Sequence, residues 1–167
     1  MIFVSVGTRP EPFTRLVNAM DRVAAQLNEP VVMQTGHTHL AVHHAQAQPW
    51  LNADDYRGLL EQARVVISQA GAGSILGARQ AGRPLIVVAR SRQFNECPDD
   101  HQCELAHAVE QLGYAQFVRD ITPTALIAAL THVIDPGVGE LTQSPLVATV
   151  RSYLAQWDRV MSRRKGF

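Results

Sequence analysis

The chain has 167 residues, of which 46% are apolar and 18% are charged, which predicts a soluble globular protein with a substantial core rather than a disordered chain. The 15 basic residues balance the 15 acidic ones, so the overall charge does not indicate nucleic acid as a partner. The basic run at 163–165 allows two interpretations, a solvated tail or a small contact for an anionic membrane or a partner protein.

Short apolar runs alternate along the chain with segments that have the apolar periodicity of helices. The runs expected to form strands cover residues 2–6, 31–35, 65–68, 85–89 and 115–118. The segments expected to form helices cover residues 14–27, 54–63, 74–81, 99–112, 123–134 and 143–162. Residues 37–53 are less regular and rich in His and Gln, and residues 90–98 are expected to form a polar loop.

Local signals mark several helix ends. Thr122 is a favourable N-cap before Pro123, which suits the first helical position. Gly113 is expected as the C-cap of the helix over 99–112. The last expected helix has an apolar stripe that should pack against its own domain, formed by Leu146, Val150, Leu154, Trp157 and Met161.

The expected strands are apolar throughout rather than alternating, which is typical of a parallel sheet covered by helices on both faces. We find no linker, internal repeat or low-complexity segment in the sequence. The sequence therefore predicts an α/β fold with one Rossmann-like domain over residues 1–167.

The sequence carries no recognisable targeting signal. Residues 1–6 lack a basic region and are too short for a signal peptide, and no stretch approaches the roughly twenty apolar residues that span a bilayer. Cys97 and Cys103 fit neither a CxxC redox motif nor a zinc pair. We therefore expect a cytosolic protein with reduced thiols.

Small, flexible or hydroxyl residues follow three of the expected strands. They are Gly7-Thr8, Thr35-Gly36-His37 and the glycine-rich stretch 69–74. Because the carboxyl ends of parallel strands meet at one edge of a sheet, these three turns are expected to line one ligand-binding cleft.

The glycine-rich turn allows two interpretations. Gly71, Gly73 and Gly77 are spaced one residue too widely for the dinucleotide fingerprint, and no acidic residue ends the following strand, which disfavours a dinucleotide-dependent oxidoreductase. Such glycines often only permit a tight corner between a strand and a helix. However, Gly73 and Ser74 begin a helix, where free N–H groups and the helix dipole favour an anion.

A second polar patch covers residues 95–102, after the fourth expected strand. Asp99 and Asp100 could simply stabilise the first turn of a helix. The Asn, Glu, His and Gln side chains of the same patch could instead bind sugar hydroxyls, and we favour this second interpretation. The histidines of residues 37–44 fit no common zinc pattern, so no metal is expected, and only His37 should face the cleft.

Several stretches together resemble the C-terminal domain of glycosyltransferase family 28. They are IFVSVGT with PFTRLV, VISQAGAGSIL, GRPLIVV and NECPDDHQCELAHAVEQLGY. They occur in this order between Met1 and about Tyr114, which makes the resemblance more specific than any one glycine loop. The chain resembles most the free-standing members, the small catalytic subunits of bacterial exopolysaccharide glycosyltransferases and of the eukaryotic enzyme that adds the second GlcNAc to the dolichol-linked precursor.

The resemblance implies the C-terminal, donor-binding half of a GT-B glycosyltransferase. Such a subunit would move a sugar from a UDP-sugar to a lipid-linked saccharide in polysaccharide biosynthesis, without a metal or other cofactor. A separate membrane-anchored subunit would bind the acceptor, which would place the chain in the cytoplasm at the inner face of the membrane. The last helix, over 143–162, could contact this partner instead of its own domain.

The strand ends and the resemblance together indicate a set of substrate-binding residues. These are Gly7, Thr8, Thr35, Gly36, Trp50, Leu51, Gln69, Gly71, Ala72, Gly73, Ser74, Glu96, Asp100, His101 and Gln102. His37 is the candidate catalytic base, although His101 or a residue of the partner subunit could also act as the base.

The chain departs from the family pattern HAGAGSILEAL at two positions. Gln69 replaces the histidine, and Gly77 replaces a glutamate that resembles the residue holding the ribose hydroxyls in the wider family. Three alternatives follow. The donor is held differently, for example by Glu96 or Asp100, or affinity for the donor arises only with the partner. In the third, the chain is a non-catalytic nucleotide-sugar-binding or scaffold subunit that needs a partner for any activity.

Overall fold

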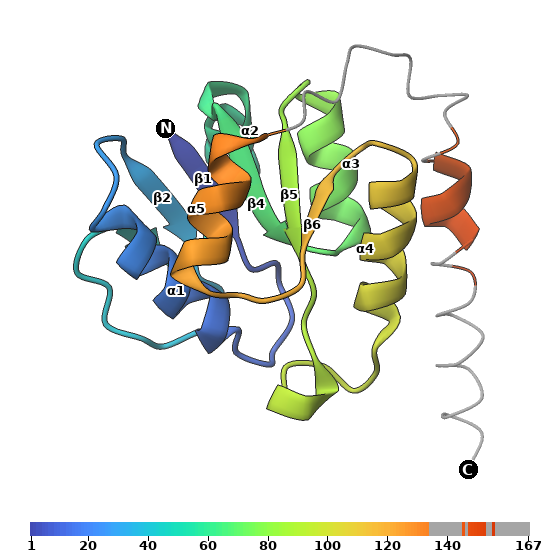
Figure 1. Ribbon diagram of the computed structural model, residues 1–167, viewed down its shortest axis with the longest axis horizontal. Coiled ribbons are helices and arrows are strands. Elements are labelled where there is room, and N and C mark those ends of the chain that lie inside the picture. Colours follow the sequence, from blue (N-terminus) through green and yellow to red (C-terminus); the bar gives the residue numbers. More distant parts are fainter. Residues whose placement is uncertain (134–144, 146, 153–154, 156–167) are drawn as a thin grey trace.

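The computed structural model describes residues 1–133, 145, 147–152 and 155 (Figure 1). Its strands are β1 (Ile2–Ser5), β2 (Val31–Gln34), β3 (Gln46–Gln48), β4 (Val65–Gln69), β5 (Leu85–Val88) and β6 (Gln116–Val118). Its helices are α1 (Thr14–Ala24), α2 (Ala53–Gln62), α3 (Ala72–Gln80), the 3₁₀ helix η1 (Arg92–Phe94), α4 (His101–Gln111) and α5 (Pro123–Thr131).

The strands form one parallel sheet in the order β3-β2-β1-β4-β5-β6. Ile2 of β1 pairs with Val31 of β2 on one side and with Val65 of β4 on the other. The strand order reverses between β1 and β4, which is the place where open α/β sheets bind their ligands. The predicted α/β class and the Rossmann-like parallel sheet are therefore confirmed.

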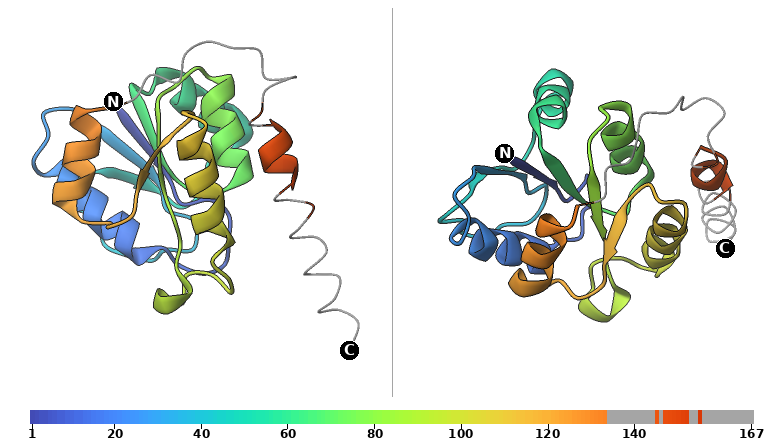
Figure 2. Two further views of the ribbon diagram at one scale, coloured as in Figure 1. Left: turned by 45° about the vertical axis from the view of Figure 1, so that its right-hand side comes forward. Right: turned by 45° about the horizontal axis from the view of Figure 1, so that its top comes forward.

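Helices cover both faces of the sheet, and each layer has its own apolar core (Figures 1 and 2). On one face α1 and α5 pack against inward residues such as Val4 and Ile67. On the other face α2, α3 and α4 pack against residues such as Phe3 and Val87. Because successive strand residues point to opposite faces and both faces are buried, the strands are apolar throughout.

The predicted helix signals act as expected. The Thr122 hydroxyl accepts a hydrogen bond from the backbone N–H of Ala125 at 3.2 Å, with Pro123 at the first helical position. Gly113 adopts φ +72° directly after the C-cap of α4, a conformation that costs glycine little. The expected start of α3 at residue 74 is two residues late, since Gly71 is the N-cap and Ala72 already belongs to the helix.

The prediction of an irregular segment over residues 37–53 is wrong for β3. This edge strand pairs in parallel with β2, but all three of its side chains are exposed. A strand that buries no side chain leaves no apolar pattern in the sequence, because its only strong interactions are backbone hydrogen bonds.

Asp21 of α1 holds the segment that leads into β3. Its buried carboxylate accepts hydrogen bonds from the backbone N–H groups of His43, His44 and Ala45, the shortest at 2.7 Å. Burial alone would raise the pKa of Asp21, but these hydrogen bonds outweigh that effect and hold its pKa below the ordinary value. The carboxylate therefore anchors the β2–β3 connection to α1.

The predicted C-terminal helix over 143–162 lies largely outside the described residues. Those that are described there, 145, 147–152 and 155, are helical, and Val150 is buried in the core that contains α4. The expected packing of the stripe on its own domain is confirmed for this residue. None of the helices described is both long enough and apolar enough to cross a membrane.

Replacing Asp21 by asparagine should lower the free energy of unfolding at pH 7 by about 1–3 kcal/mol, because three backbone N–H groups lose a charged, buried acceptor. The folded-state pKa of Asp21 is lowered, so its contribution is present above the unfolded pKa and is lost as the pH falls through the folded pKa. The difference between wild type and variant in urea unfolding should therefore shrink below about pH 4.

The matched control is Asp54→Asn, since the Asp54 side chain is 93% exposed and makes only a 3.7 Å ion pair with Arg57. This variant should change the free energy of unfolding by about 0.5 kcal/mol or less. An Asp21→Asn effect that stays constant from pH 7 to pH 3 would contradict the role given to the carboxylate.

Candidate functional site

A cavity of about 1050 Å³ opens at the carboxyl ends of the central strands. It is bounded by the turns after β1 and β4, by α2 and α3, and by the N-terminal end of α4. Its volume is at the upper end of the range of small-molecule sites. The predicted substrate-binding residues that line it are Gly7, Thr8, Leu51, Gln69, Gly71, Ala72, Gly73, Ser74, His101 and Gln102.

The turn after β2 does not line the cavity but packs against the Gly7 turn, which does. The backbone N–H groups of Thr35 and Gly36 donate to the carbonyls of Gln48 and Pro49, which ties β2 to the chain after β3. Gly36 has φ +54°, and a Cβ there would lie 2.9 Å from the Gly7 carbonyl oxygen. Thr35 and Gly36 were expected in the cleft, but they form the layer against which the Gly7 turn packs.

His37 and Trp50 also lie outside the cavity lining, which corrects the expectation that His37 faces the cleft. The positive φ of Gly36 turns the chain, and the His37 ring packs edge-on against Trp50 with 4.9 Å between ring centroids. The His37 Nδ1 atom lies 3.0 Å from the carbonyl oxygen of Arg9. Leu51 is the residue of this segment that reaches the cavity.

The two carboxylates proposed as alternative donor contacts are used elsewhere. Glu96 is buried, accepts hydrogen bonds from Arg15 at 2.6 and 2.8 Å, and accepts another from the backbone N–H of Ser91. The Asp100 carboxylate accepts from the backbone N–H of Arg92. Neither lines the cavity, and Asp99 is the acidic residue that this loop places there.

The glycine-rich turn after β4 presents free backbone donors to the cavity. Gly71 is the N-cap of α3 and no side chain caps the helix, so the N–H groups of Ala72, Gly73 and Ser74 have no side-chain acceptor. A Cβ at Gly73 would meet nothing within 4 Å, so this position faces open space. The uncapped end of a helix favours a negatively charged ligand.

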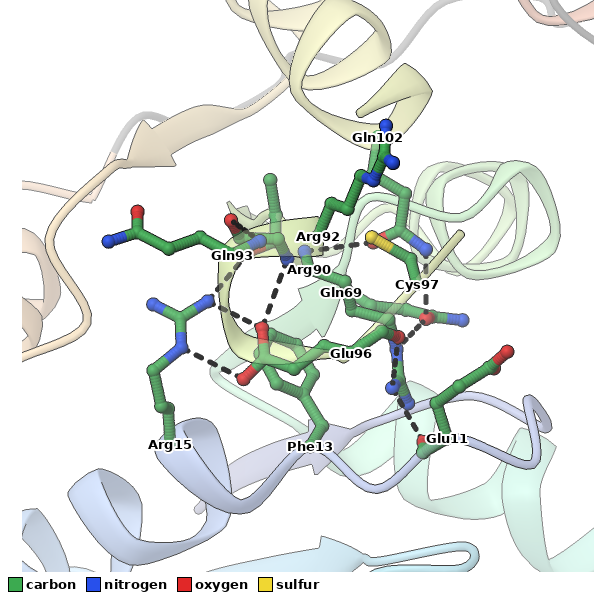
Figure 3. A network of polar contacts seen from close by, with 12 residues as sticks. Glu11, Phe13, Arg15, Gln69, Arg90, Arg92, Gln93, Glu96, Cys97 and Gln102 are labelled. Atoms are coloured by element: carbon green, nitrogen blue, oxygen red, sulfur yellow. Dashed lines mark hydrogen bonds and ion pairs between the residues drawn. The ribbon is translucent and has the colours of Figure 1, made fainter. Parts of the chain in front are cut away.

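Arg90 joins the loops that surround this end of the cavity (Figure 3). It follows β5 and is completely buried. Its guanidinium donates to the carbonyl oxygens of Val6 at 2.9 Å, Glu11 at 2.7 Å and Glu96 at 3.1 Å, and to the side-chain oxygen of Gln69 at 2.8 Å. One side chain thus connects the chain segments that follow β1, β4 and β5.

The charge of Arg90 is retained at neutral pH. Burial lowers the pKa of Arg90 to about 10, while the nearby Glu96 acts in the opposite direction. The guanidinium also lies over the Phe13 ring, 4.7 Å from its centroid. The sequence analysis assigned Arg90 only to a polar loop, although its place directly after a strand end is the same signal that identified the other turns.

Gln69 and Gln102 complete the polar network of Figure 3. The Gln69 side-chain oxygen accepts from Arg90 Nε and from Gln102 Nε2, the latter at 3.2 Å. The Gln102 oxygen accepts from the backbone N–H of Arg90 at 3.1 Å. Both amides are therefore oriented by donors that cannot reverse their roles.

The side of the cavity formed by α2 carries both apolar and charged side chains. Leu51, Tyr56 and Leu60 line it together with Arg57 and Glu61, and Tyr56 is held by an edge-on contact with Phe3. Gly77 faces the same space, and a Cβ there would lie 3.3 Å from a Leu60 methyl group. The sequence analysis did not identify this face of α2, which the helical spacing of Tyr56 and Leu60 could have indicated.

Within the part of the chain that the structure describes, no group of three His, Cys, Asp or Glu side chains could hold a metal ion. Cys97 and Cys103 are free thiols. Cys97 is buried and donates to the carbonyl oxygen of Asp99 at 2.8 Å. Burial raises the pKa of Cys97, so this thiol stays protonated at neutral pH.

The family model of the glycosyltransferase family 28 C-terminal domain matches residues 1–152. The UDP-N-acetylglucosamine transferase subunit ALG13 of Mus musculus is 32% identical over 126 residues, which cover 67% of this chain and 10% of that protein. The UDP-N-acetylglucosamine--N-acetylmuramyl-(pentapeptide) pyrophosphoryl-undecaprenol N-acetylglucosamine transferase of Synechococcus sp. (strain CC9902) is 33% identical over 95 residues, which cover 56% of this chain and 25% of that protein. The chain thus spans a quarter or less of the length of these relatives.

The crystal structure of CalG4, the calicheamicin glycosyltransferase, shares the fold with a TM-score of 0.61 at 22% identity. The superposition covers 92% of this chain and 36% of that chain. This likeness confirms the predicted α/β fold.

Replacing Arg90 by methionine should lower the free energy of unfolding by about 3 kcal/mol or more, because several buried acceptors lose their donor at about 1–3 kcal/mol each. Chemical denaturation measures the effect. Arg92→Met is the matched control, since Arg92 is exposed in the same loop and should give about 0.5 kcal/mol or less. Equal effects of the two substitutions would show that Arg90 does not hold the loops together.

Proposed function

Because the chain belongs to the glycosyltransferase family 28 C-terminal domain family, we propose that its cavity binds the UDP-sugar donor of a glycosyl transfer reaction. The proposal rests on one observation: the centre of the cavity carries free backbone N–H groups, and its two ends are lined by different kinds of side chain. The uncapped start of α3 and the Gly7 turn form the centre. The side chains of α2, with Leu51, lie on one side, and the polar side chains at the start of α4 lie on the other.

The centre of the cavity suits the diphosphate. The N–H groups of Ala72, Gly73 and Ser74 have no side-chain cap, and the α3 dipole adds a partial positive charge there. Gly7 and Gly73 leave room for a ligand to approach the backbone closely. As the sugar leaves, negative charge develops on the diphosphate, and fixed N–H donors stabilise that charge without a metal ion.

The two ends suit the nucleoside and the sugar. Leu51, Tyr56 and Leu60 offer the apolar surface on which a base can lie. His101 and Gln102, with Asp99 nearby, offer donors and acceptors for sugar hydroxyls. In this arrangement Gly77 lies on the nucleoside side.

The catalytic base is proposed to come from a membrane-anchored partner subunit that binds the lipid-linked saccharide. His37 lies outside the cavity, whereas His101 lines it at the N-terminal end of α4, where its side chain can contact the donor. The names of two relatives support this proposal. The Mus musculus protein is named a subunit, which supports a partner protein, and the Synechococcus enzyme is named for an undecaprenol-linked acceptor, which supports a lipid-linked one. From the sequence resemblance to the small subunits of exopolysaccharide glycosyltransferases, we propose a role in polysaccharide biosynthesis, of the exopolysaccharide type, in a membrane-associated complex.

A second candidate function is nucleotide-sugar binding without turnover. Gly77 favours it, because that position carries no carboxylate and faces the apolar Leu60. Such a subunit would present the donor to its partner or serve as a scaffold. Binding and turnover must therefore be measured separately.

Thermal unfolding without added metal should show stabilisation by UDP and UDP-sugars but not by GDP-sugars or NAD. At 100 times the Kd, the shift in Tm should be about 5–10 °C. Gly73→Val should abolish the shift, since its side chain would occupy the open space before α3. Gly58→Val is the matched control, because Gly58 is a helical glycine outside the cavity with 3.9 Å to the nearest atom.

No response to any uridine nucleotide, even with a candidate partner present, would overturn the donor-site proposal. With the partner and a lipid-linked acceptor added, release of UDP would identify the catalytic subunit. Binding of UDP without release would establish the second candidate function.

A further inference from the structure

Two neighbouring strands, β1 and β2, end in polar side chains that line the cavity. Gln34 is the last residue of β2 and is only 5% exposed. Its register partner is Ser5, the last residue of β1, which is also buried. Phe3, two residues before Ser5, faces the core under α2, α3 and α4, so Ser5 and Gln34 lie on that same face of the sheet.

The Ser5 hydroxyl orients the Gln34 amide. The backbone N–H of Gly7 donates to Ser5 Oγ at 3.4 Å, and Ser5 Oγ donates its only proton to Gln34 Oε1 at 2.8 Å. Reversing the amide would direct a second donor at Ser5 Oγ and remove the acceptor of the Ser5 proton. Gln34 Nε2 is therefore the end of the amide that is available to a ligand.

This nitrogen is an unused donor. Gln34 Nε2 donates to no acceptor among the residues that the structure describes, although the side chain is almost completely buried. A buried donor without an acceptor costs free energy, and a ligand that supplies an acceptor removes that cost. Because Gln34 lines the cavity, a ligand bound there can supply it.

The place of Gln34 along the sheet indicates which part of the donor it meets. The diphosphate is proposed to lie at the turns after β1 and β4, and β2 lies on the opposite side of β1 from β4 (Figure 1). On that side the cavity reaches Leu51, which follows β3, and Tyr56, which packs against Phe3. This is the apolar surface proposed for the nucleobase, so Gln34 lies nearer to the base than to the sugar.

We propose that Gln34 Nε2 donates to the O4 carbonyl oxygen of uracil and so selects a uridine donor over a cytidine donor. The inference rests on the proposed function, because it takes a UDP-sugar as the ligand. O4 lies on the edge of the base away from the ribose, which is the edge that enters a cavity first and meets a buried side chain. Cytosine has an amino group in place of O4, which would set one donor against another and leave both unpaired.

Calorimetry with UDP and CDP tests the proposal, and the ratio of the two Kd values is the readout. For the wild type, the Kd of CDP should exceed that of UDP at least tenfold. Gln34→Met removes the amide at a similar side-chain length, so UDP should bind about tenfold more weakly while CDP changes less than threefold. The ratio should therefore fall below three, whereas general damage to the cavity would weaken both nucleotides equally.

Gln48→Met is the matched control. Gln48 is the register partner of Gln34 on β3, but its side chain is exposed and does not line the cavity, so the wild-type ratio should be retained. If Gln34→Met does not fold, Ser5→Ala is the second variant. It frees the Gln34 amide to turn its oxygen toward cytosine, and the ratio should fall at least threefold.

The outcomes distinguish the two proposals. Equal Kd values of UDP and CDP for the wild type, or a ratio that is unchanged in the variant measured, would overturn the role of Gln34 and leave the donor-site proposal intact. An equal fall of the ratio in Gln48→Met would overturn it as well. Absence of UDP binding to the wild type would overturn both.

Discussion

The buried guanidinium of Arg90 is the interaction on which the cavity depends. In a parallel sheet the ladder of backbone hydrogen bonds ends with the strands, and the loops beyond have no regular partner. Arg90 supplies that partner by donating to the chain after β1, to Gln69 at the end of β4 and to the carbonyl of Glu96. Segments that are distant in sequence are thereby held at fixed separations around this end of the cavity.

A buried cation is costly unless its donors are satisfied, and here carbonyl oxygens provide most of the acceptors. The neighbouring Glu96 forms its ion pair with Arg15, so Arg90 keeps its positive charge in this layer with neutral oxygens as its acceptors. Burial lowers the pKa of Arg90 to about 10, which still leaves it charged under physiological conditions. The Arg90 guanidinium donates to the side chain of Gln69, which lines the cavity. Its positive charge therefore also favours an anion in the cavity.

The same network sets the orientation of the Gln69 side-chain amide in the cavity. Because Arg90 and Gln102 occupy the Gln69 oxygen, the nitrogen is directed toward the two glycine turns. The α2 side of the proposed site differs in character, since Tyr56 and Leu60 offer apolar surface there and Gly77 has no side chain. The site thus combines a polar centre held by Arg90 with an apolar contact surface on α2.

Features that depend on local chemistry could be predicted from the amino-acid sequence: the apolar strands, the cap at Thr122, the turn at Gly113 and the glycine-rich start of α3. Which side chains face the cavity could be seen only in the folded chain. It turned His37 away at Gly36, engaged Glu96 with Arg15, and added β3, whose exposed side chains carry no pattern. Helix caps and apolar periodicity involve residues that are close in sequence, within about one or two helical turns. The Arg90 network instead joins residues more than eighty positions apart, and no local sequence pattern indicates such a contact.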